Sequence, residues 1–369
     1  MKKIIFINDS LNGGGTEVAL INIVNSLSDK GYELTVLTSC KNNKPYDLLN
    51  KNIKYMYLLD NNKADKLFNR CIRKVLNIFN RYIINMILKM VKYDVAIAFK
   101  EGEMLKLLTS INAKKKIAWV HTDFKSFHWS KNVFNSIEKE RECFNQCETI
   151  VCVSERCRKS FIDTIGLEEK TITIYNPIDY KKVKRLANEK ILELNPKSNK
   201  FIFVTVGRLT AVKRYLELLE ICKELLMENI NNFELWIVGD GELKDDIRAY
   251  VNENRLENII LLGEKKNPFK YINAADYLIL SSKSESFALV LAESMILNVP
   301  IITTNVGIAE EIVKKYRKGI VVNNLEELKE KIKEVIISHN KIEKSFINIE
   351  EIKEFDIDKV ISKVEKILF

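Results

Sequence analysis

The sequence of 369 residues lacks several features that mark large classes of protein. No stretch approaches the roughly 20 uncharged apolar residues that a membrane-spanning helix needs, which argues against an integral helical membrane protein. The seven cysteines are an odd number, and none forms the tight C-x2-C pair typical of zinc sites. Four of them lie close together, and core packing is the favoured role, with a zinc site as the alternative: Cys143, Cys147, Cys152 and Cys157.

A secretory signal is not evident either. The apolar run at residues 4–7 is too short for the core of a signal peptide, and the polar residues Asn8, Asp9 and Ser10 follow it directly. Cysteines without a disulfide framework suit a reducing compartment. We therefore expect a cytoplasmic protein, with peripheral attachment to the inner face of the cell membrane left open.

The sequence has enough hydrophobic residues for a globular core, and its charge is unevenly distributed. A hydrophobic content of 46% and a charged content of 30% are typical of soluble globular proteins, and the length favours two domains. The formal net charge is +9. Residues 1–180 hold 28 Lys and Arg against 20 Asp and Glu, whereas the remainder holds 31 against 30. The excess on the first half indicates an anionic partner there, such as a membrane surface, nucleic acid or phosphate.

Strand-like and helix-like segments alternate in both halves. A strand at residues 3–8 leads through a glycine-rich turn into a helix at about 16–28 and a second strand at 33–38. The same pattern restarts with a strand at 201–206 and a helix at about 215–228. These βαβ units predict an α/β protein with two doubly wound, Rossmann-like domains that face each other across a cleft, where the ligand is expected.

Domain boundaries follow from composition and turn signals. Asn176-Pro177 begins a polar stretch rich in Lys and Asn that ends near Lys200. We predict a first domain at 1–177, a linker at 178–199 and a second domain at 200–355.

Two segments carry groups suited to phosphate. Gly14 and Gly15 lie between the first strand and its helix, where a glycine-rich turn lets the backbone approach an anion, although a turn without a ligand is an equal alternative. Arg208 and Lys213 follow the strand at 201–206, and both cations could contact a diphosphate. The alternative for this pair is a solvated basic loop.

A third segment holds two acids. Glu285 lies in the loop after a strand at 277–280, and Glu293 lies inside the helix that follows. The backbone N–H groups of the first helical turn, at Ala288, Leu289 and Val290, would bind a phosphate. Glu293 is surrounded by apolar residues, and a ribose diol would satisfy its carboxylate; an ordinary surface glutamate is the alternative.

One histidine and one helix complete the candidates. His121 follows the strand at 116–120, where doubly wound domains bind ligands, although a single histidine is more often structural. Residues 66–92 form a predicted amphipathic helix, and residues 63–92 carry eight basic residues and one acid, Asp65. Such a helix suits an anionic membrane surface, and packing on its own domain is the equal alternative.

Together these segments resemble the family 4 glycosyltransferases, retaining enzymes with the GT-B fold. The resemblance covers nearly the whole chain and rests on eight motifs in the family's order: Gly13-Gly14-Gly15-Thr16-Glu17, Val151-Cys152-Val153-Ser154, Tyr175-Asn176-Pro177-Ile178-Asp179, Val206-Gly207-Arg208-Leu209, Val238-Gly239-Asp240-Gly241-Glu242, Leu262-Gly263, Asn267-Pro268-Phe269-Lys270-Tyr271 and Glu285-x7-Glu293.

The resemblance implies roles for the catalytic candidates. Arg208 and Lys213 are similar to the pair that neutralises the departing donor diphosphate. Glu285 is similar to the acid beside the donor sugar, and His121 to the family histidine near the reacting sugar.

It also implies a set of substrate-binding residues. Glu293 is similar to the ribose ligand, and the glycine loop faces donor and acceptor. The full set is Gly14, Gly15, Asp240, Asn267, Phe287, Ala288, Leu289 and Glu293.

By the same resemblance, the first domain takes the acceptor and the second the nucleotide-sugar. The C-terminal helix, at 356–369, returns to the first domain.

The chain departs from the family pattern at the donor loop. Many relatives have Glu-Gly-Phe-Gly where this sequence has Glu285-Ser286-Phe287-Ala288. Ser286 and Ala288 each add a Cβ where glycine allows any φ, so the family's sugar preference transfers less well than its nucleotide site.

No metal or cofactor is expected, since the nucleotide-sugar is itself a substrate. The stretch Asp356-Ile357-Asp358 is similar to the D-x-D of metal-dependent transferases, but it lies at a predicted helix start and is read as capping or surface.

The resulting hypothesis is a metal-independent, retaining hexosyltransferase. It uses a nucleotide diphospho-sugar, with UDP favoured, and a lipid-linked or polysaccharide acceptor in cell-surface glycan synthesis. A nucleotide-sugar epimerase of the same fold is the first alternative. A non-catalytic binder of anions or nucleic acid is the second and less favoured one, and no nucleic-acid partner is expected.

Overall fold

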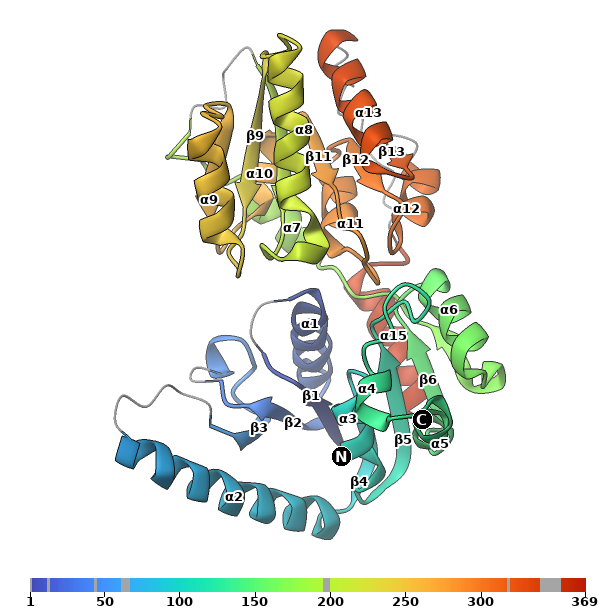
Figure 1. Ribbon diagram of the computed structural model, residues 1–369. Helices are drawn as coiled ribbons and strands as arrows, with labels where there is room; N and C mark the ends of the chain where they lie inside the picture. Colours follow the sequence, from blue (N-terminus) through green and yellow to red (C-terminus); the bar gives the residue numbers. More distant parts are fainter. Residues whose placement is uncertain are drawn as a thin grey trace. The chain divides into compact units, whose positions relative to one another are not determined.

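The computed structural model describes residues 2–11, 14–42, 45–60, 67–194, 200–316, 319–338 and 353–369, with the backbone alone for 67–77 and 316. These residues form two compact units (Figure 1). Unit 1 is Met1–Pro177 together with Ile357–Phe369, and unit 2 is Ile178–Asp356.

Unit 1 is built on a seven-stranded sheet with the order β3-β2-β1-β4-β5-β6-β7. Every neighbouring pair in it is parallel. The strands are β1 (Lys3–Asn8), β2 (Glu33–Cys40), β3 (Lys54–Leu59), β4 (Tyr93–Ala98), β5 (Ala113–Val120), β6 (Thr149–Cys152) and β7 (Thr171–Thr173). The helices are α1 (Gly15–Asp29), α2 (Leu67–Met90), α3 (Glu103–Thr109), α4 (Lys131–Phe134), α5 (Ile137–Asn145), α6 (Glu155–Ile165) and α15 (Ile357–Leu368), with 3-10 turns η1 (Pro45–Asp47) and η2 (Glu168–Lys170).

Unit 2 repeats this plan with a six-stranded parallel sheet in the order β10-β9-β8-β11-β12-β13. Its strands are β8 (Phe201–Val206), β9 (Phe233–Val238), β10 (Ile259–Gly263), β11 (Tyr277–Leu280), β12 (Ile301–Thr304) and β13 (Gly319–Val322). Its helices are α7 (Tyr180–Ala187), α8 (Tyr215–Met227), α9 (Lys244–Glu253), α10 (Phe269–Ala274), α11 (Leu289–Ile296), α12 (Ala309–Tyr316) and α13 (Leu325–Ser338), with the 3-10 turn η3 (Ala211–Lys213).

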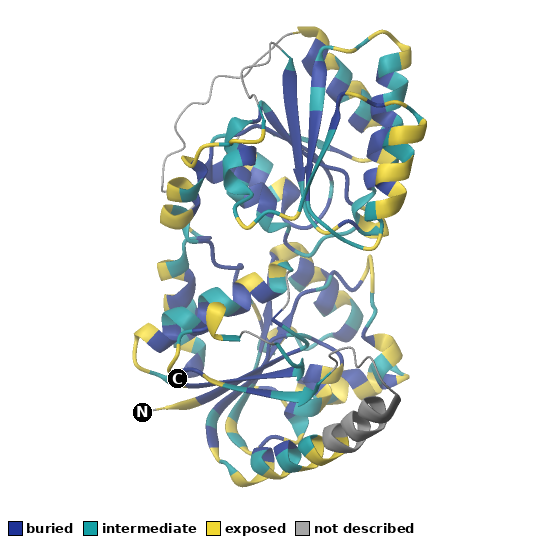
Figure 2. Ribbon diagram, turned by 90° about the vertical axis from the view of Figure 1, so that its left-hand side faces the viewer, coloured by how far each residue is buried: buried dark blue, intermediate teal, exposed yellow. Residues whose placement is uncertain are grey.

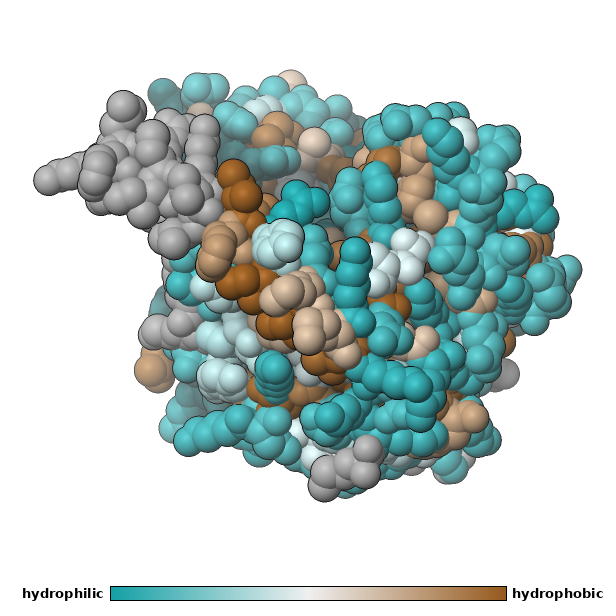
Figure 3. Space-filling model, turned by 90° about the horizontal axis from the view of Figure 1, so that it is seen from below, coloured by the Kyte–Doolittle hydropathy of each residue, from teal (hydrophilic) through white to brown (hydrophobic). Residues whose placement is uncertain are grey.

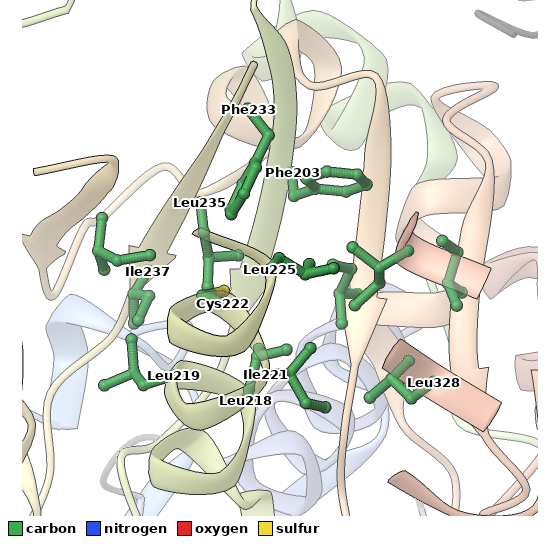
Figure 4. Close-up of a cluster of buried hydrophobic side chains, with 14 of the residues drawn as sticks. Phe203, Leu218, Leu219, Ile221, Cys222, Leu225, Phe233, Leu235, Ile237 and Leu328 are labelled. Carbon is green, nitrogen blue, oxygen red and sulfur yellow. The ribbon is translucent and has the colours of Figure 1, made fainter. Parts of the chain in front are cut away.

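The central strands are short apolar runs because both faces of each sheet are covered by helices. In unit 1, Ile4–Ile7 of β1 are completely buried. In unit 2, Phe203 of β8 and Phe233 of β9 meet edge to face with ring centroids 6.2 Å apart, and Leu218, Leu225 and further side chains of α8 pack below them (Figure 4). Figure 2 shows the same separation, with buried residues along the strands and exposed ones on the outer helices.

The strand order fixes where ligands are expected. In each unit the chain first extends the sheet in one direction and then returns to the other side of its first strand, so the order reverses between β1 and β4 and between β8 and β11. In open α/β sheets this reversal leaves a crevice at the carboxyl ends of the two strands, where ligands bind.

The C-terminal helix α15 belongs to unit 1 by its contacts. Its apolar side chains, Val360, Ile361, Val364 and Leu368, are buried and follow helical spacing. The Lys30 ammonium pairs with Glu365 at 2.5 Å, and the Phe369 ring stacks on Tyr32. The helix therefore covers α1, at the opposite end of the sequence.

The stretch predicted as a linker, residues 178–199, contains a packed helix. Its described residues include α7, which packs against α10 and α11, so this stretch is a structural part of unit 2. Most residues of α7 are polar, with Val183 and Ala187 as its buried residues, which is why the sequence of this stretch suggests a linker. The prediction also missed the edge strands β3 and β13.

Candidate functional site

The loops after β8 and β11 meet at the reversal point of unit 2. Arg208 and Lys213 follow β8, and Glu285 follows β11, as predicted from the strand ends. The two strands are neighbours, so residues that are about 70 positions apart in sequence come together.

Lys213 and Glu285 form an ion pair across this reversal point. The Ser282 hydroxyl donates a second hydrogen bond to the same carboxylate oxygen at 2.9 Å. Both charged side chains are largely sheltered, with 22% of Lys213 and 14% of Glu285 exposed. The lysine that is predicted to meet a diphosphate is thus held in place by the acid that is predicted to meet the sugar.

Arg208 and Tyr215 lie on either side of Lys213 in the sequence. Arg208 is exposed and lies two residues after β8. Tyr215 is buried under the loop, and its burial raises the pKa of the phenol, with the Glu285 charge acting in the same direction. Tyr215 therefore stays neutral and packs under the loop after β8, next to Gly207.

The glycines of the neighbouring loops allow close backbone contact. A Cβ on Gly239 would lie 1.9 Å from the Gly207 carbonyl oxygen, so any other residue there would push the loops after β8 and β9 apart. The close approach keeps Arg208 and Asp240 on adjacent loops.

The loop from Glu285 to α11 contains one unusual backbone conformation. Ala288 has φ 63° and ψ 71°, a left-handed conformation that an alanine adopts only at a cost in free energy, and it caps α11. Phe287 is buried against Phe355, so its side chain supports the loop. Leu289 begins the helix, and its backbone N–H lies in the free first turn.

Glu293 lies one turn further along α11 in a poorly solvated position. Burial raises the pKa of its carboxyl group from 4.5 to about 7. Within the described part of the chain, no group donates a hydrogen bond to this carboxylate or pairs with it. A desolvated acid without a protein partner costs stability, so Glu293 is poised for a ligand that donates hydrogen bonds.

Asp240 and Asn267 both have partners within unit 2. Asp240 follows β9 and pairs with Lys244 of α9, which lowers the pKa of its carboxyl group. The Asn267 amide donates to the Leu186 carbonyl at 2.8 Å and to Glu189 at 2.9 Å, next to α7. Asn267 thus fastens α7 to the loop after β10.

A second charged cluster lies at the reversal point of unit 1. Asp9 follows β1 and Lys100 follows β4, and their side chains pair at 2.5 Å. Burial opposes the lysine charge, but the Asp9 carboxylate outweighs it and raises the pKa of Lys100. Each unit therefore carries a lysine–carboxylate pair at the place where its strand order reverses.

His121 is buried beside this pair, after β5. Burial, with a contribution from the nearby Lys100 charge, lowers the pKa of its imidazole to about 3, so the ring is neutral at any working pH. Its ring packs against Phe99, with centroids 4.9 Å apart. His121 can accept or donate a hydrogen bond to a sugar hydroxyl but does not carry a positive charge.

Glu101 holds the loop that contains His121, and the sequence analysis did not identify it. Its buried carboxylate accepts hydrogen bonds from the His121 backbone N–H at 3.0 Å, the Trp129 indole at 3.0 Å and the Thr122 hydroxyl. Gly102 lets the Trp129 ring approach, since a Cβ there would lie 2.5 Å from the ring. A single acid after a strand has no distinctive spacing, so nothing in the sequence alone marked it.

The glycine loop is partly described. Residues 12 and 13 lie outside the described residues, whereas Gly14 is the extended residue that precedes α1 and Gly15 begins the helix. The first turn of α1 therefore presents its N–H groups after β1. Glu17, in the same turn, accepts a hydrogen bond from the Ser10 hydroxyl at 3.5 Å.

Metal ligands do not gather anywhere in the described part of the chain, where no group of three His, Cys, Asp or Glu residues could hold an ion. The buried Cys152 lies in β6, and the Cys157 thiol donates to the Thr122 carbonyl at 3.1 Å. Asp358 lies in the first turn of α15, at the helix start predicted from the sequence.

These features define the class of protein to which the chain belongs. The chain is a two-unit α/β protein, and unit 2 presents a lysine, an arginine and a helix N-terminus at one reversal point. Such a group of donors and positive charges suits a ligand with phosphate groups.

Sequence comparisons identify the family. The model described as Glycosyltransferase Family 4 matches residues 13–182, and the model described as Glycosyl transferases group 1 matches residues 187–351. Together they cover most of the chain, which belongs to the family 4 glycosyltransferases and has the GT-B fold. The predicted family and fold class are therefore confirmed.

Individual relatives match over part of their length. An uncharacterized glycosyltransferase of Methanocaldococcus jannaschii is 29% identical over 241 residues, which is 61% of this chain and 58% of that protein. A Campylobacter jejuni enzyme is 29% identical over 185 residues, 49% of this chain and 48% of that protein. Its name is N-acetylgalactosamine-N,N'-diacetylbacillosaminyl-diphospho-undecaprenol 4-alpha-N-acetylgalactosaminyltransferase. The matches thus span about half the length of these relatives.

Among solved structures, Anabaena HepE in complex with UDP and glucose has a TM-score of 0.77 to this chain. The two are 18% identical, and the match covers 100% of this chain and 99% of the other. At this identity the likeness concerns the fold.

Proposed function

We propose that this protein transfers a sugar, with retention of configuration, from a nucleotide diphospho-sugar to a lipid-linked or polysaccharide acceptor in cell-surface glycan synthesis. The observation that carries the proposal is the arrangement at the β8–β11 reversal point. There the Lys213–Glu285 pair lies after the two strands, and the partnerless carboxylate of Glu293 lies in the helix that follows.

The donor would bind in unit 2. Its diphosphate would contact Lys213, Arg208 and the free N–H groups at the start of α11, and its ribose hydroxyls would donate to Glu293. Lys213 would then exchange Glu285 for phosphate, which frees the Glu285 carboxylate to accept hydrogen bonds from the sugar.

In the transfer step, the bond between the sugar's anomeric carbon and the phosphate oxygen breaks, and the acceptor oxygen bonds to the same face. The acceptor proton passes to the departing phosphate oxygen. Positive groups that are already in place stabilise the charge that develops on the leaving diphosphate. Neutral His121 would hydrogen-bond a sugar hydroxyl.

UDP is the favoured nucleotide and a polyprenol-linked glycan is the favoured acceptor. The name of the Campylobacter relative specifies a diphospho-undecaprenol acceptor, and HepE was solved with UDP. The excess of cations in residues 1–180 also suits an acceptor that carries a diphosphate.

The first experiment is a thermal-shift screen of UDP, GDP and their sugars against the purified protein, followed by transfer assays with the best donor. A ligand that binds only the folded state raises its stability. Release of an altered sugar without any acceptor would indicate an epimerase, and salt-sensitive RNA binding without nucleotide-sugar binding would indicate a binding protein.

Metal removal provides a further test. Because Lys213, Arg208 and the α11 N-terminus would neutralise the diphosphate, we expect transfer to continue at an unchanged rate after exhaustive treatment with EDTA. A loss of activity that added Mg²⁺ or Mn²⁺ restores would contradict the metal-independent mechanism.

A further inference from the structure

Helix α2 has an apolar face that unit 1 does not cover. Within its described half, five large apolar side chains are exposed to between 46% and 74%: Ile78, Phe79, Tyr82, Met86 and Met90. Single exposed apolar residues are common on protein surfaces, but a contiguous group of this size on one helix marks an interaction site. The band of brown and tan side chains in Figure 3 is this face seen from below.

The opposite side of α2 is firmly attached to unit 1. Ile84 and Leu88 are buried, and the Asn80 amide donates to the Tyr57 and Leu58 carbonyls at 2.8 and 3.1 Å. At about 100° per residue, the exposed apolar residues lie opposite this attached side. The helix is therefore fixed on unit 1 and directs its apolar face outward.

The charged residues of this part of α2 and of the two residues after it all have one sign. Residues 78–92 contain three cations, Arg81, Lys89 and Lys92, which are exposed, and no Asp or Glu. Arg81 lies at one edge of the apolar face, Lys89 falls within that face, and Lys92 follows the end of the helix. Apolar residues beside cations are typical of helices that lie in the interface of an anionic bilayer.

More positive charge adjoins the C-terminal end of α2. The Asn112 side chain donates to the Lys89 carbonyl at 3.2 Å, and β5 begins at the next residue. A hollow of about 480 Å³ lies at this strand start, lined by Lys114, Lys115, Lys116, Glu148 and Lys170 among other residues. Lys114 pairs with Asp94 and Lys115 with Glu148, so Lys116 and Lys170 supply the net positive charge of this lining. In Figure 1, α2 and the start of β5 both lie at the lower end of unit 1.

We propose that the exposed face of α2 docks unit 1 on an anionic lipid bilayer, with the apolar side chains inserted among the acyl chains and the cations at the headgroups. A second copy of the chain is disfavoured as the occupant, because pairing two such faces would bring like charges together. Anionic headgroups complement the same cations. This proposal does not depend on the donor chemistry in unit 2, and its test requires no sugar.

The test is flotation of the full chain with vesicles. We expect binding to vesicles of equal parts phosphatidylglycerol and phosphatidylcholine at low salt, at least tenfold weaker binding to phosphatidylcholine alone, and release at high salt. The variant F79S/Y82S/M86S and the variant R81E/K89E should each reduce binding at least tenfold. Circular dichroism and UDP binding should be unchanged in both.

Matched controls keep the result specific. L192S/M227S/I337S removes three exposed apolar side chains from unit 2, and K184E/R185E makes the same charge change on α7, so both should float like the wild type. Full binding by F79S/Y82S/M86S, or equal binding to both kinds of vesicle, would overturn the proposal.

Two further outcomes would also count against it. One is a concentration-dependent dimer, seen by sedimentation without vesicles, that F79S/Y82S/M86S abolishes. The other is competition by inorganic phosphate beyond that of chloride at equal ionic strength, which would indicate a discrete phosphate site.

Discussion

At the scale of single residues, the most informative side chain is Lys213. It already forms an ion pair with Glu285, and both are sheltered from water, so the charge is fixed before any ligand arrives. Fixed charges stabilise a developing negative charge better than mobile ones because they need no reorganisation during the reaction.

Replacing Lys213 with alanine should therefore impair chemistry more than folding. We expect K213A to reduce kcat by about 10²- to 10³-fold, the range found when a transition-state contact of this kind is lost. K213R should recover part of the activity because it keeps the positive charge. Steady-state kinetics with circular dichroism as the folding control would measure this, and normal turnover by folded K213A would show that the diphosphate role is wrong.

Glu293 allows a prediction about pH. Its pKa is raised from 4.5 in the unfolded chain to about 7 in the folded protein, so between these values the folded state holds a proton that the unfolded state releases. The wild type thus loses stability as pH rises from 4.5 to about 7. E293Q, which keeps a neutral side chain, should match the wild type near pH 4.5 and exceed it above pH 7 by roughly 1–3 kcal/mol.

The same substitution should weaken nucleotide binding, since an amide is a poorer acceptor than a carboxylate for the two ribose hydroxyls. We expect about a tenfold loss in UDP affinity by calorimetry. The exposed Glu253 of α9 is a matched control, and E253Q should change neither property. Unaltered UDP affinity in E293Q would remove Glu293 from the ribose site.

Several site residues could be predicted from sequence because they follow strands. Arg208, Lys213 and Glu285 are examples, since the carboxyl ends of parallel strands are where ligands gather. That Lys213 and Glu285 touch could not be predicted, because it depends on β8 and β11 being neighbours in the sheet. Glu101 was missed because its role comes from three donors that only the folded chain brings together.

At the scale of elements, α15 shows how a terminal segment can support a domain. Its buried stripe covers α1, and its Glu365 meets Lys30 and Tyr32. The family resemblance had implied a C-terminal helix at 356–369 that returns to the first domain. By contrast, α7 was taken for a linker because few of its residues are apolar.

Ile361 tests the contribution of α15. Truncation to alanine leaves a cavity in a fully buried position, so we expect I361A to lower the free energy of unfolding by about 2–4 kcal/mol. K359A, at an exposed position on the same helix, should change it by less than about 0.5 kcal/mol. Denaturant titration measures both, and equal stability of I361A and the wild type would mean that the helix is not packed as described.

At the scale of the whole molecule, the chain has two sheets with the same plan, and most of its net positive charge lies in residues 1–180. The fold class could be predicted in full because the βαβ pattern occurs twice, each time with short buried strands. The edge strands β3 and β13, of six and four residues, were not predicted.

The division into units leads to a prediction about ligand effects. UDP at about 100 times its dissociation constant should stabilise the folded state by about 2.7 kcal/mol. In hydrogen exchange, the protection should concentrate in unit 2, at residues 207–214 and 285–293, whereas the β1–β4 reversal in unit 1 should change little without an acceptor. Protection confined to unit 1 would contradict the assignment of the donor site.

The desolvated carboxylate of Glu293 in α11 also affects the lifetime of the protein in a cell. An enzyme that gives up stability to keep a carboxylate ready for its substrate is most easily unfolded when that substrate is scarce. Proteases act on the unfolded fraction, and bound nucleotide reduces that fraction. On the proposed function, Glu293 would thus link the abundance of the enzyme to the supply of nucleotide-sugar, so that starved cells would clear a transferase they cannot use.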